Sequence, residues 1–279
     1  KSGIQLIVAT SGSSGEPKGV MLSVAAIAAS ARAVNDALGL KADDCWLNCL
    51  PQYHIAGLSI INRCHSAGAA MVLHQNFNAE QTWKDLNRYR VTHISLVPAM
   101  LSRLLDASSD AGPPASLRVA LIGGDSLSSS LARRAHRAGW PIVISYGMTE
   151  TGSLCVFDDK GDAGMETGRV GHSLEGFEIT VANGEGTINV RGPALMSGYA
   201  NPALLPGTGL VDDSFTTGDT GRLDETGVLS VTGRSADALV SAGRTIHPRE
   251  VEEQLEGYDG VGRVAVTATP DPVWGDRLV

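Results

Sequence analysis

Aromatic residues are scarce in this sequence, and basic residues do not outnumber acidic ones. Only 5% of the 279 residues are Phe, Trp or Tyr, so the core must be mainly aliphatic and rich in alanine. Lys and Arg number 22 against 30 Asp and Glu, which gives a formal net charge of −8. A general nucleic-acid surface needs clustered Lys and Arg, so we expect no nucleic-acid partner.

Long apolar runs and paired cysteines are also missing. No apolar run approaches the roughly twenty residues that a membrane span requires. The apolar stretch in the first residues, KSGIQLIVATSG, is too short for a signal peptide. The four cysteines (Cys45, Cys49, Cys64 and Cys155) form no C-x-x-C pair, and no histidine is spaced to complete a zinc site. We therefore expect reduced cysteines in a cytoplasmic protein. The sequence leaves open whether the chain forms a homo-oligomer.

Strand-like and helix-like segments alternate through the first half of the chain. Apolar, β-branched runs predict strands at 4–9, 45–50, 69–74, 92–97, 117–123 and 142–146. Helical spacing predicts helices at 24–38, 57–68, 79–90, 98–107 and 127–139, with Ser23 and Asn78 as N-caps. Strands that alternate with helices of this length predict an α/β fold with a doubly wound, largely parallel sheet.

The pattern changes after about residue 159. GFEITVANGEGTINVRG (176–192) predicts two strands joined by a turn containing Asn-Gly, and FTTGDTGRLDETGVLSVTG (215–233) predicts more short strands. A helix at 248–257 and a strand at 263–269 follow. We expect an α/β core at 1–160, a small β-rich subdomain at 161–235, and at 236–279 the start of an α+β C-terminal domain.

A loop rich in glycine and serine follows the first predicted strand. TSGSSGEPKG runs from Thr10 to Gly19, and glycine loops bind phosphate because their backbone N–H groups approach the oxygens without a side chain intervening. A Walker P-loop does not fit, because Lys18 follows Pro17 and precedes Gly19 instead of Ser or Thr. The G-x-G-x-x-G fingerprint and the G-x-S-x-G elbow of hydrolases do not fit either. A chance linker is the remaining alternative.

This stretch resembles the signature of the adenylate-forming (AMP-forming) acyl-CoA synthetase and ligase superfamily, a threonine or serine followed by S-G-[ST]-[ST]-G-x-P-K-G. Further motifs of that family follow in its order: PQYHIAG (51–57), LIGGDSL (121–127), SYGMTETG (145–152), FTTGDTGRL (215–223) and GRSADALVSAGRTIHPREVE (233–252). Each motif alone could be structural, but their shared order favours function. DDCWLNCLPQYHIAG and THISLVPAML look closest to o-succinylbenzoate–CoA ligases and to other aryl- and acyl-CoA ligases.

The resemblance implies a nucleotide site. The β- and γ-phosphates would be held by Thr10, Ser11, Gly12, Ser13, Ser14, Gly15 and Lys18. Gly123 and Gly124 would line the adenine and acyl pockets, Gly147 would contact the nucleotide, and Tyr146 would stack on adenine. Thr149 would contact the α-phosphate, and Glu150 would coordinate Mg²⁺. Asp219 and Arg234 would bind the ribose, and Gly243 would leave room for the pantetheine arm of CoA.

The resemblance also implies an acyl pocket and a reaction. The pocket walls would be His54, Ser59, Val97, Ala99, Gly123 and Met148, which suggest a mainly apolar acid of moderate size. The parent enzyme would join a carboxylic acid to ATP as an acyl-adenylate, with Lys18, Thr149 and Glu150 as catalytic residues, and would then transfer the acyl group to CoA. ATP, Mg²⁺ and CoA are therefore the implied cofactors. His54 is typical of CoA ligases, whereas peptide-synthetase modules usually carry an aspartate in that region.

The chain departs from the family pattern at the hinge and at both ends. The family hinge reads G-R-x-[DK], but here Ala236 follows Ser235 and Asp237 comes one place later. Family members have more residues at both ends, and no lysine follows Lys160 to reach the α-phosphate. We therefore expect the middle part of a ligase, incomplete for adenylation by itself. A peptide-synthetase-type module and an inactive nucleotide-binding fragment stay open as alternatives.

Overall fold

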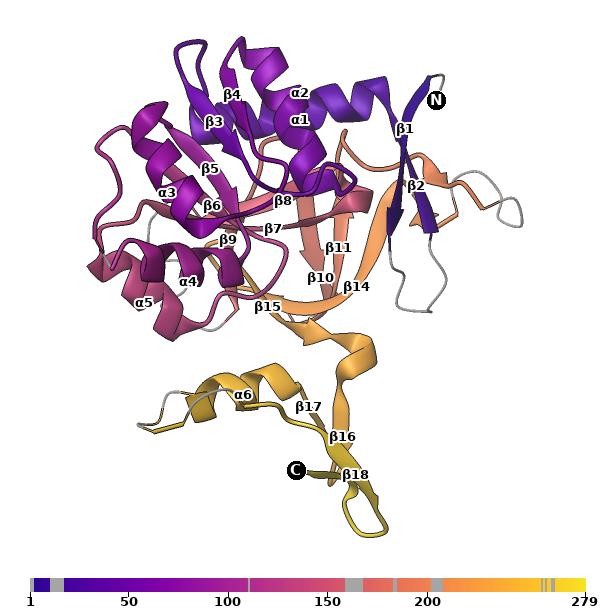
Figure 1. Cartoon of the computed structure of the whole chain (residues 1–279). Helices are drawn as coiled ribbons and strands as arrows, with labels where there is room; N and C mark the ends of the chain where they lie inside the picture. Colours follow the sequence, from indigo (N-terminus) through magenta and orange to yellow (C-terminus); the bar gives the residue numbers. More distant parts are fainter. Residues whose placement is uncertain are drawn as a thin grey trace.

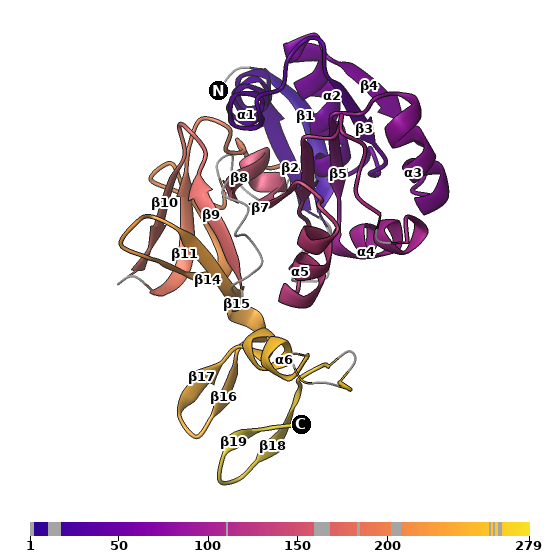
Figure 2. The same ribbon diagram turned by 90° about the vertical axis from the view of Figure 1, so that its left-hand side faces the viewer.

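The computed structural model describes residues 3–10, 18–109, 111–158, 168–182, 185–201, 208–256, 258, 260–261 and 264–279. Within these residues one sheet of 12 strands runs through most of the molecule, with the order β10-β11-β14-β15-β9-β8-β7-β6-β5-β3-β4 and β13 beside β14. Helices cover its α/β half, and the C-terminal segment lies apart from it (Figures 1 and 2). No helix in the described part of the chain is both long and apolar enough to span a membrane.

The α/β half of the sheet is parallel and fully buried at its centre. Its strands are β3 (Cys45–Asn48), β4 (Ala70–Leu73), β5 (His93–Leu96), β6 (Val119–Ile122) and β7 (Ile142–Met148). All four residues of β5 and of β6 are buried, as expected for parallel strands with helices on both faces. The predicted α/β fold with its parallel sheet is confirmed.

Two groups of helices cover the two faces of this sheet. The helices are α1 (Val24–Leu38), α2 (Ile55–Ala67), α3 (Ala79–Arg88), α4 (Pro98–Ala107) and α5 (Ser129–Arg137). Helices α1 and α2 lie together on one face, and α3, α4 and α5 form a row on the other (Figures 1 and 2). The side chains of Ser23 and Asn78 accept hydrogen bonds from backbone N–H groups of the first turns of α1 and α3, which confirms both predicted N-caps.

The second half of the sheet is antiparallel. Its strands are β8 (Ser153–Asp158), β9 (Arg169–Ser173), β10 (Glu178–Val181), β11 (Glu185–Arg191), β13 (Leu210–Val211), β14 (Ser214–Leu223) and β15 (Leu229–Arg234). It joins the parallel half through β7 and β8, and β8 in turn pairs with β9. The Asn-Gly turn expected between β10 and β11 falls on 183–184, outside the described residues. A separate sheet pairs β1 (Ile4–Thr10), β2 (Lys18–Ser23) and β12 (Gly198–Tyr199).

The C-terminal segment has its own four-stranded sheet, β17-β16-β19-β18. It contains the short helix η3 (Ser235–Asp237), β16 (Leu239–Ser241), β17 (Arg244–Ile246), α6 (Pro248–Glu256), β18 (Ala268–Asp271) and β19 (Gly275–Leu278). The strand predicted at 263–269 is wrong at its start, because β18 begins only at Ala268. The backbone N–H of Val266 donates instead to the carboxylate of Glu252 on α6, at 2.8 Å.

Candidate functional site

The largest group of predicted site residues lies at the carboxyl ends of the parallel strands. Strand β4 lies outside β3, and the chain then crosses back to β5 on the other side of β3. The loops after β3 and β5 therefore diverge, and ligands of open α/β sheets bind at such a switch point. A cavity of about 1160 Å³ opens there between this edge and residues of β2, β12, β14 and β15.

The cavity brings together residues from distant parts of the chain. Of the predicted site residues, its lining includes Thr10, Lys18, His54, Val97, Gly123, Gly124, Gly147, Met148, Thr149, Glu150, Asp219 and Arg234. Ser11, Gly12, Ser13, Ser14 and Gly15 lie outside the described residues. Thr10 on β1 pairs with Lys18 on β2. The two residues that flank the glycine- and serine-rich segment therefore meet at the cavity.

Four predicted site residues do not line this cavity. Ser59 is buried on α2, where its hydroxyl donates to the carbonyl of Ala56 at 3.1 Å. Ala99 is exposed on α4. Tyr146 is turned to Asp219, and Gly243 lies between β16 and β17 with a φ of +75° and open space around it. The roles assigned to these four residues stay predictions, as do the roles of the predicted residues that line the cavity.

One glycine of the site is required by a close backbone approach. Gly147 lies where β7 and β8 pair irregularly, and a Cβ atom there would collide with the backbone of Ser153 and Leu154. Any side chain at this position would force the two strands apart. Gly147 therefore keeps the end of β7 close to β8, and Met148 and Thr149 follow it directly into the cavity wall.

The cavity wall brings Tyr199 into contact with Glu150 and Lys18. We call this part of the cavity the phosphate end, after the roles predicted for Lys18 and Glu150. The hydroxyl of Tyr199 donates to Oε1 of Glu150 at 3.0 Å, and the Lys18 ammonium lies 5.3 Å from the centre of the Tyr199 ring. Within the described part of the chain no group of three or more His, Cys, Asp or Glu residues could hold a metal ion. Mg²⁺ is commonly bound by one or two carboxylates together with substrate phosphates, and the carboxylate of Glu150 beside a lysine fits that arrangement.

Asp219, the predicted ribose ligand, also lines the cavity. Its Oδ2 accepts a hydrogen bond from the Tyr146 hydroxyl at 2.8 Å, and Nε of Arg234 lies 3.3 Å from its Oδ1. Asp219 and Arg234 are register partners on β14 and β15. Burial raises the pKa of Asp219, and the Tyr146 hydroxyl and the Arg234 guanidinium oppose that rise. The carboxylate thus already has two partners where a pair of ribose hydroxyls would bind.

Arg63 is a cavity residue that the sequence motifs did not indicate. It lies on α2 with 1% of its surface exposed, and it lines the cavity. Its Nη2 donates to the Ser153 hydroxyl at 2.6 Å, and the guanidinium lies 5.4 Å from the centre of the Trp46 ring. Burial lowers the pKa of Arg63 to about 9, which leaves it charged at neutral pH. Its helical spacing from buried Ser59 and Ile60 was the only signal in the sequence.

No carboxylate neutralises Arg63 in the described part of the chain. Its Nε has no hydrogen-bond partner there, and no ion pair joins Arg63 to an Asp or Glu. A buried, uncompensated cation is costly, because burial removes its hydration and supplies no opposite charge. The pocket predicted to be mainly apolar therefore also has a positive charge in its wall.

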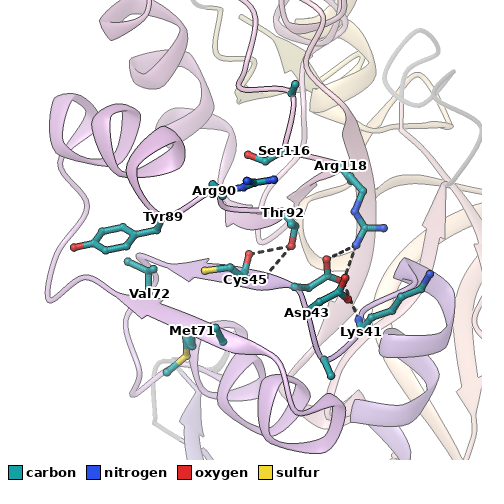
Figure 3. Close-up of a pocket in the computed structure, with 14 residues that line it drawn as sticks. Lys41, Asp43, Cys45, Met71, Val72, Tyr89, Arg90, Thr92, Ser116 and Arg118 are labelled. Atoms are coloured by element: carbon teal, nitrogen blue, oxygen red, sulfur yellow. Dashed lines mark hydrogen bonds and ion pairs between the residues drawn. The ribbon is translucent and has the colours of Figure 1, made fainter.

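A second cavity, of about 930 Å³, lies at the other end of the parallel strands. Figure 3 shows residues that line it, including Lys41, Cys45 and Arg90. Here the buried charge has a partner: Nη2 of Arg118 donates to both carboxylate oxygens of Asp44, at 2.6 Å each. None of the predicted site residues lines this cavity.

Comparison with known proteins identifies relatives of this chain. The sequence profile described as AMP-binding enzyme matches residues 4–200. The chain is 36% identical over 278 residues to a 2-succinylbenzoate–CoA ligase of Enterococcus faecalis, covering 96% of this chain and 57% of that protein. A ligase of the same name from Listeria monocytogenes is 37% identical over 269 residues, with the same coverage.

A solved structure shares the fold. The o-succinylbenzoate CoA synthetase MenE from Bacillus subtilis, in complex with its acyl-adenylate intermediate, superposes with a TM-score of 0.90 and 33% sequence identity, over 99% of this chain and 59% of that one. The same enzyme with ATP and a magnesium ion gives a TM-score of 0.89 over 99% and 60% of the two chains. The chain thus spans about three fifths of the length of these relatives. By its sequence and its fold, the chain belongs to the family of AMP-binding enzymes.

Proposed function

We propose that this chain forms the ATP- and acid-binding part of an acid–CoA ligase that activates an aromatic dicarboxylic acid, with 2-succinylbenzoate as the candidate substrate. Relatives of that name support the reaction. The observation that carries the substrate class is the buried guanidinium of Arg63 in the cavity wall, which lacks a carboxylate partner in the described residues.

A second carboxylate on the substrate would explain why the positive charge of Arg63 is buried in the cavity wall. In 2-succinylbenzoate one carboxylate can be activated while the other stays ionised in the pocket. An ionised carboxylate in a cavity needs a cation, and Arg63 supplies one with a planar fork of donors. A monocarboxylic acid would leave that guanidinium uncompensated and would bind less tightly.

The first reaction step needs mainly positioning by the protein. An oxygen of the substrate carboxylate attacks the α-phosphorus of ATP, the new P–O bond forms, and the bond to pyrophosphate breaks. Lys18 would compensate charge on the leaving pyrophosphate, and Asp219 would accept hydrogen bonds from the ribose. Glu150 would hold Mg²⁺, which would supply positive charge to neutralise the phosphate oxygens.

The second step transfers the acyl group to a thiol, for which we propose CoA. The CoA thiolate attacks the acyl carbonyl and releases AMP, and Gly243 would leave the path of the pantetheine arm open. Offering CoA or a carrier protein to preformed acyl-adenylate tests this choice. Free cysteines among the described residues and the use of ATP and CoA support a cytoplasmic location.

A pair of acids tests the proposal directly on this chain. The second acid, 4-oxo-4-phenylbutanoate, has the same chain and ring as 2-succinylbenzoate but lacks the carboxylate on the ring. Calorimetry in the presence of AMP should show 2-succinylbenzoate binding about 10²-fold more tightly than the second acid. Arg63→Met should remove this difference, whereas Arg32→Met, an exposed arginine on α1, should keep it. Equal binding of both acids by the wild-type chain would contradict the proposal.

A further inference from the structure

Residues 196–200 connect the lysine and the glutamate of the phosphate end. The backbone N–H of Met196 donates to the carbonyl of Glu150 at 2.8 Å, and that of Ala200 donates to the carbonyl of Gly19 at 2.7 Å. Between these two bonds, Tyr199 pairs with Val20 of β2, the strand that begins at Lys18. This segment therefore fixes the distance between two elements that are far apart in the sequence.

The side chain of Tyr199 completes that connection inside the cavity. It is 9% exposed, its hydroxyl donates to Oε1 of Glu150, and its ring lies under the Lys18 ammonium. A tyrosine phenol has an ordinary pKa of about 10, so at neutral pH it is protonated and can donate this hydrogen bond. A Cβ atom on Gly209 would come within 2.8 Å of the ring, which shows how closely the ring is enclosed.

We propose that Tyr199 is a positioning residue for the metal site: it orients the Glu150 carboxylate toward a Mg²⁺ ion bound with ATP and holds Lys18 beside the phosphates. The inference rests on the proposed function. A carboxylate that accepts a hydrogen bond at one oxygen keeps the other oxygen in a fixed direction for a cation. Such outer partners of metal ligands commonly change metal affinity by about 10–100-fold. The face of the ring attracts the ammonium of Lys18 at the same time.

Two variants at one position separate the hydroxyl from the ring. Tyr199→Phe removes the hydrogen bond to Glu150 and keeps the ring under Lys18, whereas Tyr199→Leu removes both. Tyr89→Phe is the matched control, because Tyr89 lines the second cavity, away from the phosphates. The probe is Mn²⁺, whose free concentration is read by electron paramagnetic resonance in the presence of saturating α,β-methylene-ATP. Binding of the same nucleotide without metal is measured in parallel.

The expected results differ between the variants. Tyr199→Phe should weaken Mn²⁺ binding at least about tenfold and leave metal-free nucleotide binding within about twofold. Tyr199→Leu should lose the same metal affinity and also weaken metal-free nucleotide binding about two- to fivefold, because Lys18 loses the ring. Tyr89→Phe should match the wild-type chain in both measurements.

Three results would overturn the inference. Wild-type Mn²⁺ affinity in Tyr199→Phe would show that the hydroxyl does not orient Glu150. An equal loss of metal and of metal-free nucleotide binding in Tyr199→Phe, together with a lowered melting temperature, would assign Tyr199 to the fold alone. A wild-type chain that binds no nucleotide would remove the proposed function, and this inference with it.

Discussion

The two cavities lie at opposite ends of the same parallel strands, and they differ in how their buried charges are compensated. At the carboxyl ends, Arg63 is buried without a carboxylate among the described residues. At the amino ends, the buried Asp44 accepts both hydrogen bonds of a partner arginine, Arg118. Because an unpaired buried charge costs stability and a paired one does not to the same degree, the first end is suited to an ionic ligand, whereas the second is already satisfied.

The largest effect should come from removing the unpaired charge. Arg63→Met keeps the length of the side chain and removes the buried cation, so the free energy of unfolding of the free chain should rise by about 1–4 kcal/mol. Urea denaturation of the two chains measures this. A loss of stability of similar size would mean that Arg63 is a structural residue and would break the comparison between the two cavities.

At the second cavity, removing a charge should lower the free energy of unfolding instead of raising it. Asp44→Ala leaves Arg118 without its partner and also removes the acceptor for the backbone N–H of Lys41. Hydrogen bonds to charged groups contribute about 1.5–3 kcal/mol, and the effect should lie near the lower figure because 46% of the Arg118 side chain is exposed. The same urea denaturation measures it, and ATP binding should be unchanged. Weaker ATP binding by Asp44→Ala would show that a change at the second cavity alters ligand affinity at the first.

Asp219 lies between these two cases, because its carboxylate is buried but only partly compensated by Arg234, which is 64% exposed. Asp219→Ala should weaken ATP binding about tenfold through loss of the hydrogen bonds to ribose. Pyrophosphate has no ribose, so its affinity should stay the same. Titration of both ligands decides the matter, and an equal loss for both would assign Asp219 to the fold of this edge instead.

Helices whose first residues are typical of a helix N-terminus, such as a capping side chain or a proline, could be predicted from the sequence. The caps Ser23 and Asn78 fixed where α1 and α3 begin, and α4 covers the predicted 98–107. Most of the described residues that the family motifs indicated also line one cavity. The strand predicted at 263–269 begins only at Ala268, because a side chain of α6 takes the backbone N–H of Val266 that a strand partner would otherwise use.

Arg63 and Tyr199 could not be assigned from the sequence for a different reason. What distinguishes Arg63 is the lack of a partner in space, and no local pattern reports that. The contact of Tyr199 with Glu150 depends on the pairing of β12 with β2, which is formed by segments far apart in the chain. The contacts of both residues therefore depend on how the strands around the cavity are arranged in space.

The smallest expected effect is a change in the free energy of unfolding at acid pH, and it reports on the ion pair between Asp44 and Arg118. Burial alone would raise the pKa of Asp44, but the backbone N–H of Lys41 and the Arg118 guanidinium outweigh it and lower that pKa below the ordinary value of 3.8. A carboxyl whose pKa is lower in the folded state stabilises the fold above its unfolded pKa, and this contribution is lost as the pH falls through the folded pKa. Urea denaturation of the wild-type chain should therefore show stability falling below about pH 4, and Asp44→Asn should make that fall shallower. Asp219, whose pKa burial raises, contributes in the opposite direction, so Asp219→Asn should make the fall steeper. If both variants follow the wild-type curve, the contrast between compensated and uncompensated charges does not extend to these two carboxylates.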